Sequence, residues 1–161
     1  MVLNGQKKYG FTPVVIDENG KIPFEDLYFD IVFCSSVIEH VTIPKSQVWN
    51  TKDQKQFKKT ALERQYNFAK EINRLGKTYF VQTPNRWFPI ETHTWLPFVS
   101  YLPRKILLPF LKLSNRFWIK KTTPDWNLLS KSEFQYLFPD AKIITEKFFG
   151  FTKSLIAIKK S

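Results

Sequence analysis

The clearest pattern of hydrophobic and polar positions along the chain lies in residues 52–75, where apolar side chains recur every three or four residues. This spacing places them on one face of an α-helix, while lysines and glutamines fill the opposite face. Gly76 follows at the position where a C′ glycine commonly ends a helix. The pattern therefore predicts an amphipathic helix whose buried side consists of Phe57, Ala61, Leu62, Phe68, Ala69, Ile72 and Leu75.

Shorter apolar runs on either side of this helix predict strands. Residues 29–35 form a nearly continuous apolar run, which is typical of a parallel strand that is buried on both faces. Residues 77–83 form a second run, which Pro84 and Asn85 end, and residues 13–17 form a short third run that ends on an acid. The order strand, helix, strand predicts a parallel sheet with a crossover helix.

The second half of the chain is predicted to contain an irregular segment followed by a helix and two strands. Residues 86–126 are rich in proline and aromatic residues, so we expect an irregular lid or insertion there. Ser130 and Glu133 then have capping-box spacing and predict a second helix. Residues 141–147 and 153–160 are two β-like runs around a short loop, which favours an antiparallel hairpin. The length of 161 residues suits a single domain that contains all these elements.

The charge balance narrows the class of partner. The chain has 25 Lys and Arg against 14 Asp and Glu, for a net charge of +11. Such a balance favours phosphate-bearing substrates, anionic lipid surfaces or nucleic acid, although a plain basic, solvated surface explains it equally well. Nucleic acid is the weakest of these, because no RNA-binding motif is present and the charge is not gathered on one predicted helix.

The single cysteine and the absence of long apolar segments bear on the compartment. Cys34 lies within the apolar run 29–35, where we expect a buried structural thiol, and one cysteine excludes an internal disulfide. Residues 1–10 lack the apolar segment of a signal peptide, and no apolar run approaches the roughly 20 residues that span a bilayer. We therefore expect a cytoplasmic protein, with contact at a membrane surface left open.

Three stretches together resemble the class I S-adenosylmethionine-dependent methyltransferases, particularly the small-molecule, type 11-like branch. Residues 22–32 (IPFEDLYFDIV) are similar to the family's LPF-x-D-x-x-FD-x-V signature, and residues 36–41 (SVIEHV) to its x-x-L-EH-V turn. The helix that ends before Gly76, the strand after it and Thr83-Pro84-Asn85 complete the likeness, which covers about residues 12–160. The resemblance implies an α/β, Rossmann-like sheet with strand order 3-2-1-4-5-7-6, mostly parallel and with a C-terminal antiparallel hairpin.

One departure from the family concerns the cofactor. The family's first strand carries a glycine-rich turn, D-x-G-x-G-x-G, that cradles S-adenosylmethionine, whereas this chain has five glycines, at positions 5, 10, 20, 76 and 150, none in a G-x-G pattern. The chain matches the family from about its third strand, so we expect an N-terminally truncated, incomplete sheet. The strand predicted at residues 13–17 would lack its usual neighbour, and the next strand would offer an unpaired apolar edge. We therefore expect an oligomer, a complementing chain or marginal stability.

The resemblance also implies roles for particular residues. An acid after the third strand contacts the adenine in the family, and either Asp17 or Glu18 stands there; Ser35, Ser36 and Glu39 would face the cofactor. His40 is the candidate general base, since its ordinary pKa lies near 6.5, or it only caps the turn beneath the cofactor. His93 with Glu91, and Asn85, Arg86 and Trp95, are candidates for the acceptor pocket, although His93 also suits an ordinary loop. At these spacings the histidines and acids predict no metal site.

Residues 95–121 mix aromatic and basic side chains and contain no acid. Such a cover suits an anionic, partly apolar acceptor, for example a lipid- or sugar-linked one, or a membrane surface. A lid that packs on the domain with its lysines pointing outward explains it equally well. Methyl transfer to a small-molecule or lipid/sugar-linked acceptor is thus the first hypothesis. A non-catalytic remnant that serves as a binding or partner module is the second, because the absent cofactor motif argues against autonomous activity.

Overall fold

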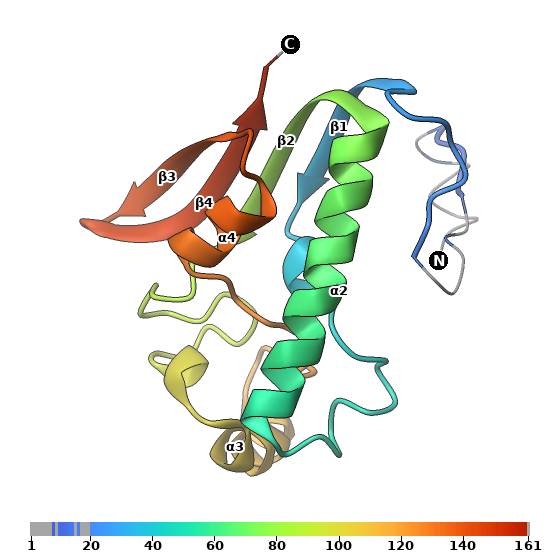
Figure 1. Cartoon of the computed structure of the whole chain (residues 1–161). Coiled ribbons are helices and arrows are strands. Elements are labelled where there is room, and N and C mark those ends of the chain that lie inside the picture. The colour runs from blue at the N-terminus through green and yellow to red at the C-terminus, as the bar shows by residue number, and fades with distance from the viewer. Residues whose placement is uncertain (1–7, 9, 15, 17–19, 161) are drawn as a thin grey trace.

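The computed structural model describes residues 8, 10–14, 16 and 20–160, and in these it shows a four-stranded sheet with helices packed on one face (Figure 1). Strand β1 (Phe29–Ser35) and strand β2 (Gly76–Pro84) pair in parallel, with Phe33 opposite Phe80. The crossover between them contains the one-turn 3-10 helix η1 (Ile38–His40) and the long helix α2 (Gln54–Leu75). The predicted parallel pair and crossover helix are confirmed.

Helix α2 begins and ends for identifiable local reasons. The Asp53 carboxylate accepts hydrogen bonds from the backbone N–H groups of Lys55 and Gln56, which satisfies two of the donors at the first turn. The helix ends at Leu75, directly before Gly76 as predicted, but Gly76 lacks the left-handed conformation that a C′ glycine commonly adopts: its φ is −102° and it already starts β2. Glycine is needed there for close approach: a Cβ would lie 2.7 Å from the Thr78 carbonyl oxygen and 2.9 Å from a Val32 methyl.

The C-terminal part forms as predicted. Helix α4 (Lys131–Leu137) begins with a complete capping box between Ser130 and Glu133. Strands β3 (Lys142–Phe148) and β4 (Phe151–Lys159) then form an antiparallel hairpin. The two residues of its turn, Phe149 and Gly150, have positive φ angles of 47° and 82°, as tight hairpin turns require. Strand β4 inserts antiparallel beside β2.

The resulting strand order is β1-β2-β4-β3. It agrees with the 4-5-7-6 half of the order that the resemblance implies, in which the last strand of the chain lies between the fifth and the sixth. The expectation of a mostly parallel sheet is wrong for the described residues, which hold one parallel and two antiparallel pairs. No further parallel strand lies beside β1 in the described part of the chain, so the antiparallel hairpin makes up half of the sheet.

The described residues before β1 do not pair with the sheet. Pro13, Val14 and Ile16 have irregular backbone, and the other residues of the predicted strand 13–17 lie outside the described residues. Val14 and Ile16 remain 41% and 45% exposed. A run of this length has few apolar side chains to bury, and without a hydrogen-bonded neighbour it gains little from an extended conformation.

Burial on both faces was predicted for β1, and this is wrong. Helices α2 and α4 cover one face, where Cys34 is buried as expected, and burial of its thiol raises its pKa to about 11. On the other face Ile31 and Phe33 are 69% and 71% exposed, and Phe33 stacks on Phe80 with ring centroids 5.3 Å apart. No described element covers this face.

The segment predicted to be irregular, 86–126, contains the 3-10 helix η2 (Val99–Tyr101) and the 14-residue helix α3 (Arg104–Phe117). Pro103 is the N-cap of α3 and Pro109 lies within it, so prolines that suggested loop are accommodated at the start and in the early part of a helix. The segment lies beyond the carboxyl ends of β1 and β2 (Figure 1). A small core forms around this segment, made of its own Val99, Leu107, Leu111 and Trp126 together with Leu128, which follows it.

Candidate functional site

Ionisable side chains from three separate segments meet at the carboxyl ends of β1 and β2. Helix η1, which follows β1, brings Glu39 and His40, and the loop after β2 brings Glu91 and His93. The segment between α3 and α4 adds Asp125. In open α/β sheets ligands bind outside the carboxyl ends of the strands, so this is the expected place for a site. We call these five residues the carboxylate–histidine cluster.

His40 is held by Asp125. Its Nδ1 lies 3.1 Å from Asp125 Oδ1, and its side chain stays 36% exposed while that of Asp125 is 11% exposed. The hydrogen bond to Asp125 raises the pKa of His40, and burial opposes this rise only in part. Burial tends to raise the pKa of Asp125, but the hydrogen bond with His40 and the nearby charges of His40 and Lys45 together lower it below its ordinary value. With Nδ1 engaged, Nε2 is the nitrogen that His40 has available for a ligand or a proton.

His93 is paired with Glu91. His93 Nδ1 lies 2.6 Å from Glu91 Oε1, and the backbone N–H groups of His93 and Thr94 also donate to this carboxylate. Glu91 is 1% exposed; burial works to raise its pKa, yet the bonds from His93 hold it below the ordinary value. The His93 ring stacks on Trp126 at 5.6 Å and meets the His40 ring edge-on at 4.7 Å. Both histidines therefore have their Nδ1 on a buried carboxylate.

Glu39 lies between the two histidines and the sheet. It is fully buried, its Oε2 accepts a hydrogen bond from Thr83 Oγ1 at 2.9 Å, and burial raises its pKa. Its Oε1 is also buried and has no hydrogen-bond partner among the described residues; the nearest cationic candidate is His93 Nε2, 4.0 Å away. Since Glu39 faces the histidines and not the solvent, its geometry favours a role in the cluster over direct contact with a cofactor.

A buried amide pair fixes the orientation of η1. Gln65 of α2 donates to the carbonyl oxygens of Ile38 and Asn127 at 2.9 and 3.0 Å, and the Asn127 side chain donates back to Gln65 Oε1. The Asn127 backbone N–H donates to the Glu39 carbonyl oxygen. These bonds tie η1 to the segment that carries Asp125, so the pairing of His40 with Asp125 rests on a rigid frame.

The residues predicted to hold the cofactor fit it only in part. Ser35 and Ser36 are exposed at the end of β1, with both hydroxyls bonded to Gln82 Oε1, and Ser36 has a positive φ of 53°. Asp17 and Glu18 lie outside the described residues. Glycine-rich backbone, which close approach to the cofactor requires, is not among the residues at this edge. The described residues thus offer two hydroxyls to a cofactor and no cradle.

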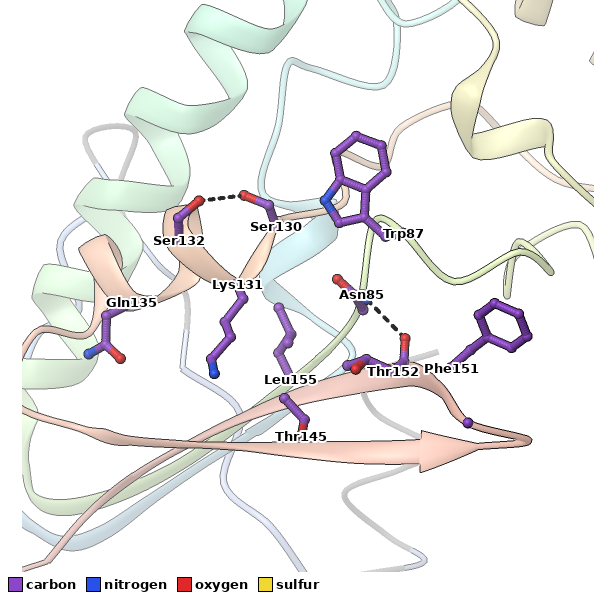
Figure 2. A pocket seen from close by; sticks show the side chains of 11 residues that line it. Asn85, Trp87, Ser130, Lys131, Ser132, Gln135, Thr145, Phe151, Thr152 and Leu155 are labelled. Atoms are coloured by element: carbon purple, nitrogen blue, oxygen red, sulfur yellow. Dashed lines mark hydrogen bonds between the residues drawn. The ribbon is translucent and has the colours of Figure 1, made fainter.

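The remaining predicted residues lie apart from the histidines. Asn85 is buried, and its amide donates to the Thr152 carbonyl oxygen; it lines an open pocket of about 790 Å³ between α4 and the hairpin (Figure 2). Arg86 lies over the Trp87 ring, and Trp95 is 61% exposed beneath the Lys120 ammonium group. The structure therefore brings Glu91, His93, Glu39 and His40 together but leaves Asn85, Arg86 and Trp95 outside the cluster.

Sequence reasoning missed Asp125, Thr83 and Trp126. Asp125 follows His40 by 85 residues, and no local periodicity links them. One signal was available: Asp125 is the first acid after Glu91 in an otherwise basic stretch. An isolated acid in such surroundings is often paired.

Comparison with solved structures shows a distant likeness. A solved structure titled as a SAM dependent methyltransferase from Aquifex aeolicus matches with 13% sequence identity and a TM-score of 0.41, over 97% of this chain and 59% of that one. The chain thus spans about 59% of the length of that protein. No family model and no curated protein matches the chain.

Proposed function

We propose that this chain carries the acceptor side of an S-adenosylmethionine-dependent methyltransferase. The observation that carries the proposal is the carboxylate–histidine cluster at the carboxyl ends of β1 and β2, in a sheet whose order β1-β2-β4-β3 agrees with the family's 4-5-7-6 half. S-adenosylmethionine would supply the methyl group. The chain's own residues would bind and orient the acceptor and take a proton from it.

His40 is the proposed general base. Its Nδ1 is on Asp125, its ring is partly exposed, and its raised pKa makes the neutral imidazole a better proton acceptor than a free histidine. His93, paired with Glu91 and stacked on Trp126, is the proposed second acceptor-facing residue. A positioned base contributes about 10²–10⁴-fold to a rate. His40→Gln should therefore lower methyl transfer by about that factor.

The test begins with the cofactor. We expect the isolated chain to bind S-adenosylmethionine weakly in calorimetry at millimolar ligand, since it offers little more than Ser35 and Ser36. Ser35→Val should weaken this binding, whereas Ser132→Ala, at an exposed serine in the first turn of α4, should leave it unchanged. No detectable binding at millimolar ligand would refute autonomous methyl transfer. It would instead favour the alternative that the chain is a non-catalytic binding or partner module.

The acceptor is proposed to be anionic and lipid-linked, and α3 supports this. Helix α3 exposes an apolar stripe with the spacing i, i+4, i+7, i+11, and its members are 38–72% exposed: Ile106, Phe110, Leu113 and Phe117. Lys105, Lys112 and Arg116 flank the stripe, and no acid occurs between Glu91 and Asp125. An exposed apolar stripe between cations is the pattern of a helix that lies on an anionic membrane surface. No described helix is both long and apolar enough to cross a bilayer.

Sedimentation with vesicles tests the membrane contact. The chain should pellet with phosphatidylserine-containing vesicles at low salt, and less so with neutral vesicles or at high salt. Phe117→Ser should reduce the pelleted fraction, while Phe149→Ser, at an even more exposed phenylalanine in the β3–β4 turn, should not. Equal pelleting with both vesicle types, or none with either, would contradict the proposal and leave a soluble anionic acceptor.

A further inference from the structure

The carboxylate–histidine cluster has the donor set of a transition-metal site. One ligand atom each of Glu39, His40 and His93 lies within 4.8 Å of the other two. Two imidazoles and one carboxylate are the ligands of several catalytic zinc centres, where a fourth position stays open for water or substrate. The residues come from η1 and from the loop after β2. The fold therefore brings together a ligand set that the spacing of these residues in the sequence did not predict.

The hydrogen bonds around the histidines are also typical of a metal site. Metal-bound histidines commonly donate their other ring N–H to a carboxylate, which fixes the ring and the tautomer. Both histidines have this arrangement: His40 Nδ1 is 3.1 Å from Asp125, and His93 Nδ1 is 2.6 Å from Glu91. Each therefore keeps Nε2 as its ligand nitrogen. Three carboxylates, those of Glu39, Glu91 and Asp125, thus surround the two imidazoles in a chain of net charge +11.

The third observation is the unpartnered oxygen of Glu39. Glu39 is fully buried, its Oε2 is satisfied by Thr83, and its Oε1 has no partner among the described residues while it faces His93 Nε2 at 4.0 Å. A buried polar atom without a partner costs about 1–3 kcal/mol and usually has an explanation in a missing ion or water. Around a tetrahedral zinc ion the ligand atoms lie roughly 3.4 Å apart, as follows from metal–ligand distances of about 2.0–2.2 Å. Small rotations of the three side chains would bring the ligand atoms from separations of up to 4.8 Å to this distance.

We propose that Glu39, His40 and His93 bind a divalent transition-metal ion of the zinc type, with Asp125 and Glu91 as the outer partners of the two histidines. The metal site uses the same two histidines as the proposed methyl transfer, but it can be tested separately, because metal binding can be measured without a methyl donor. It also bears on that function: a coordinated Nε2 of His40 accepts no proton. With the metal bound, an acceptor oxygen would be activated by polarisation at the open position.

The probes are Co²⁺, which reports coordination in its visible absorption, and Zn²⁺ in competition with it, both added to the purified full chain. We expect one ion per chain and a spectrum of four- or five-coordinate Co²⁺. Glu39→Gln and His93→Gln should abolish the spectrum. Asp125→Asn should weaken binding by about 10–100-fold, as loss of an outer carboxylate does in other sites. Glu63→Gln, an exposed acid on α2, is the matched control and should bind as the unmodified chain does.

Two outcomes would overturn the proposal: no Co²⁺ or Zn²⁺ binding by the unmodified chain, or binding that both Glu39→Gln and His93→Gln leave intact. If either variant fails to fold, X-ray absorption of the Zn²⁺-loaded unmodified chain decides instead. Two imidazoles and oxygen donors around zinc support the site, and any sulfur donor or fewer than two imidazoles refutes it. Failure of S-adenosylmethionine binding with intact metal binding would remove the proposed function and leave the metal site.

Discussion

Arg104 should be a principal determinant of stability in the half of the molecule that carries α3. It is 2% exposed, and no carboxylate of the described residues lies within ion-pair distance of it. Its guanidinium donates to the carbonyl oxygens of Thr51, Pro124 and Val48, and it lies 3.7 Å above the Phe57 ring. Burial lowers its pKa to about 10, so it is still charged at neutral pH.

The cost of Arg104→Ala follows from these contacts. Three carbonyl oxygens lose their donor, two of them in buried hydrogen bonds and one, that of Thr51, in a part-buried bond, and each unmade bond costs about 1–3 kcal/mol. Because the truncated side chain leaves room for water, we take the lower part of that range, which sums to about 3–5 kcal/mol. This is a large share of the 5–15 kcal/mol that typically holds a domain together. The loss of the bond to Pro124 should also loosen its neighbour Asp125 and hence His40.

Urea denaturation followed by tryptophan fluorescence measures this effect. We expect the midpoint to fall strongly for Arg104→Ala, by an intermediate amount for Arg104→Lys, which keeps the charge but reaches fewer carbonyls, and by less than about 0.5 kcal/mol for the exposed neighbour Lys105→Ala. A loss below 1 kcal/mol for Arg104→Ala would refute the assignment of three essential carbonyl contacts.

Three further predictions follow from single contacts. Glu133→Gln should cost about 1 kcal/mol above pH 4.5, because it removes the carboxylate of the capping box. Burial tends to raise the pKa of Glu133, but its hydrogen bonds lower that pKa overall. In urea melts across pH, the difference between the two proteins should therefore vanish as the pH falls through the lowered pKa. Gly76→Ala should cost about 1–3 kcal/mol in the same melts, since its Cβ would overlap Val32; an unchanged midpoint contradicts this. The chain should self-associate through the open edge and bare face of β1 in sedimentation velocity, and Ile31→Thr with Phe33→Thr should abolish this; a monomer at the highest concentration would exclude it.

The parts of the fold that the sequence predicted are those in which local pattern decides the outcome. Helix α2 has the 3.6-residue period over six turns, and α4 and the β3–β4 hairpin have their caps and turn residues in place. Helix α3 was not predicted, because its prolines were interpreted as ending any helix. Pro103 lies at the N-cap, where no helical hydrogen bond is lost, and Pro109 removes only one backbone hydrogen bond from the helix. Burial of Ile31 was misjudged because an apolar run says nothing about which neighbours cover it.

The residues of the candidate site also differ in whether local sequence identifies them. Glu39, His40, Glu91 and His93 were identified because each pair is contiguous or nearly so and follows a predicted strand. Asp125 was not, since its partnership with His40 depends on how residues 86–126 fold back over the sheet. The positions of Asn85 and Trp95 outside the cluster could not be predicted for the same reason: side-chain direction depends on tertiary contacts, such as those with the Thr152 carbonyl and the Lys120 ammonium group.

The cluster itself argues for a ligand. Of the described buried side-chain atoms without a hydrogen-bond partner, Glu39 Oε1 alone belongs to an acid. The neighbouring buried acid, Glu91, shows that this fold can satisfy such a group, because its carboxylate accepts from two backbone N–H groups and from His93. If Glu39 contributed only to stability, we would expect both of its carboxylate oxygens to accept hydrogen bonds, as those of Glu91 do. Alternatively, we would expect a glutamine at this position, whose amide could donate to His93. A carboxylate that is left half satisfied, opposite two histidines already oriented by other carboxylates, is costly to folding, and the proposed cation would supply the partner that Glu39 Oε1 lacks.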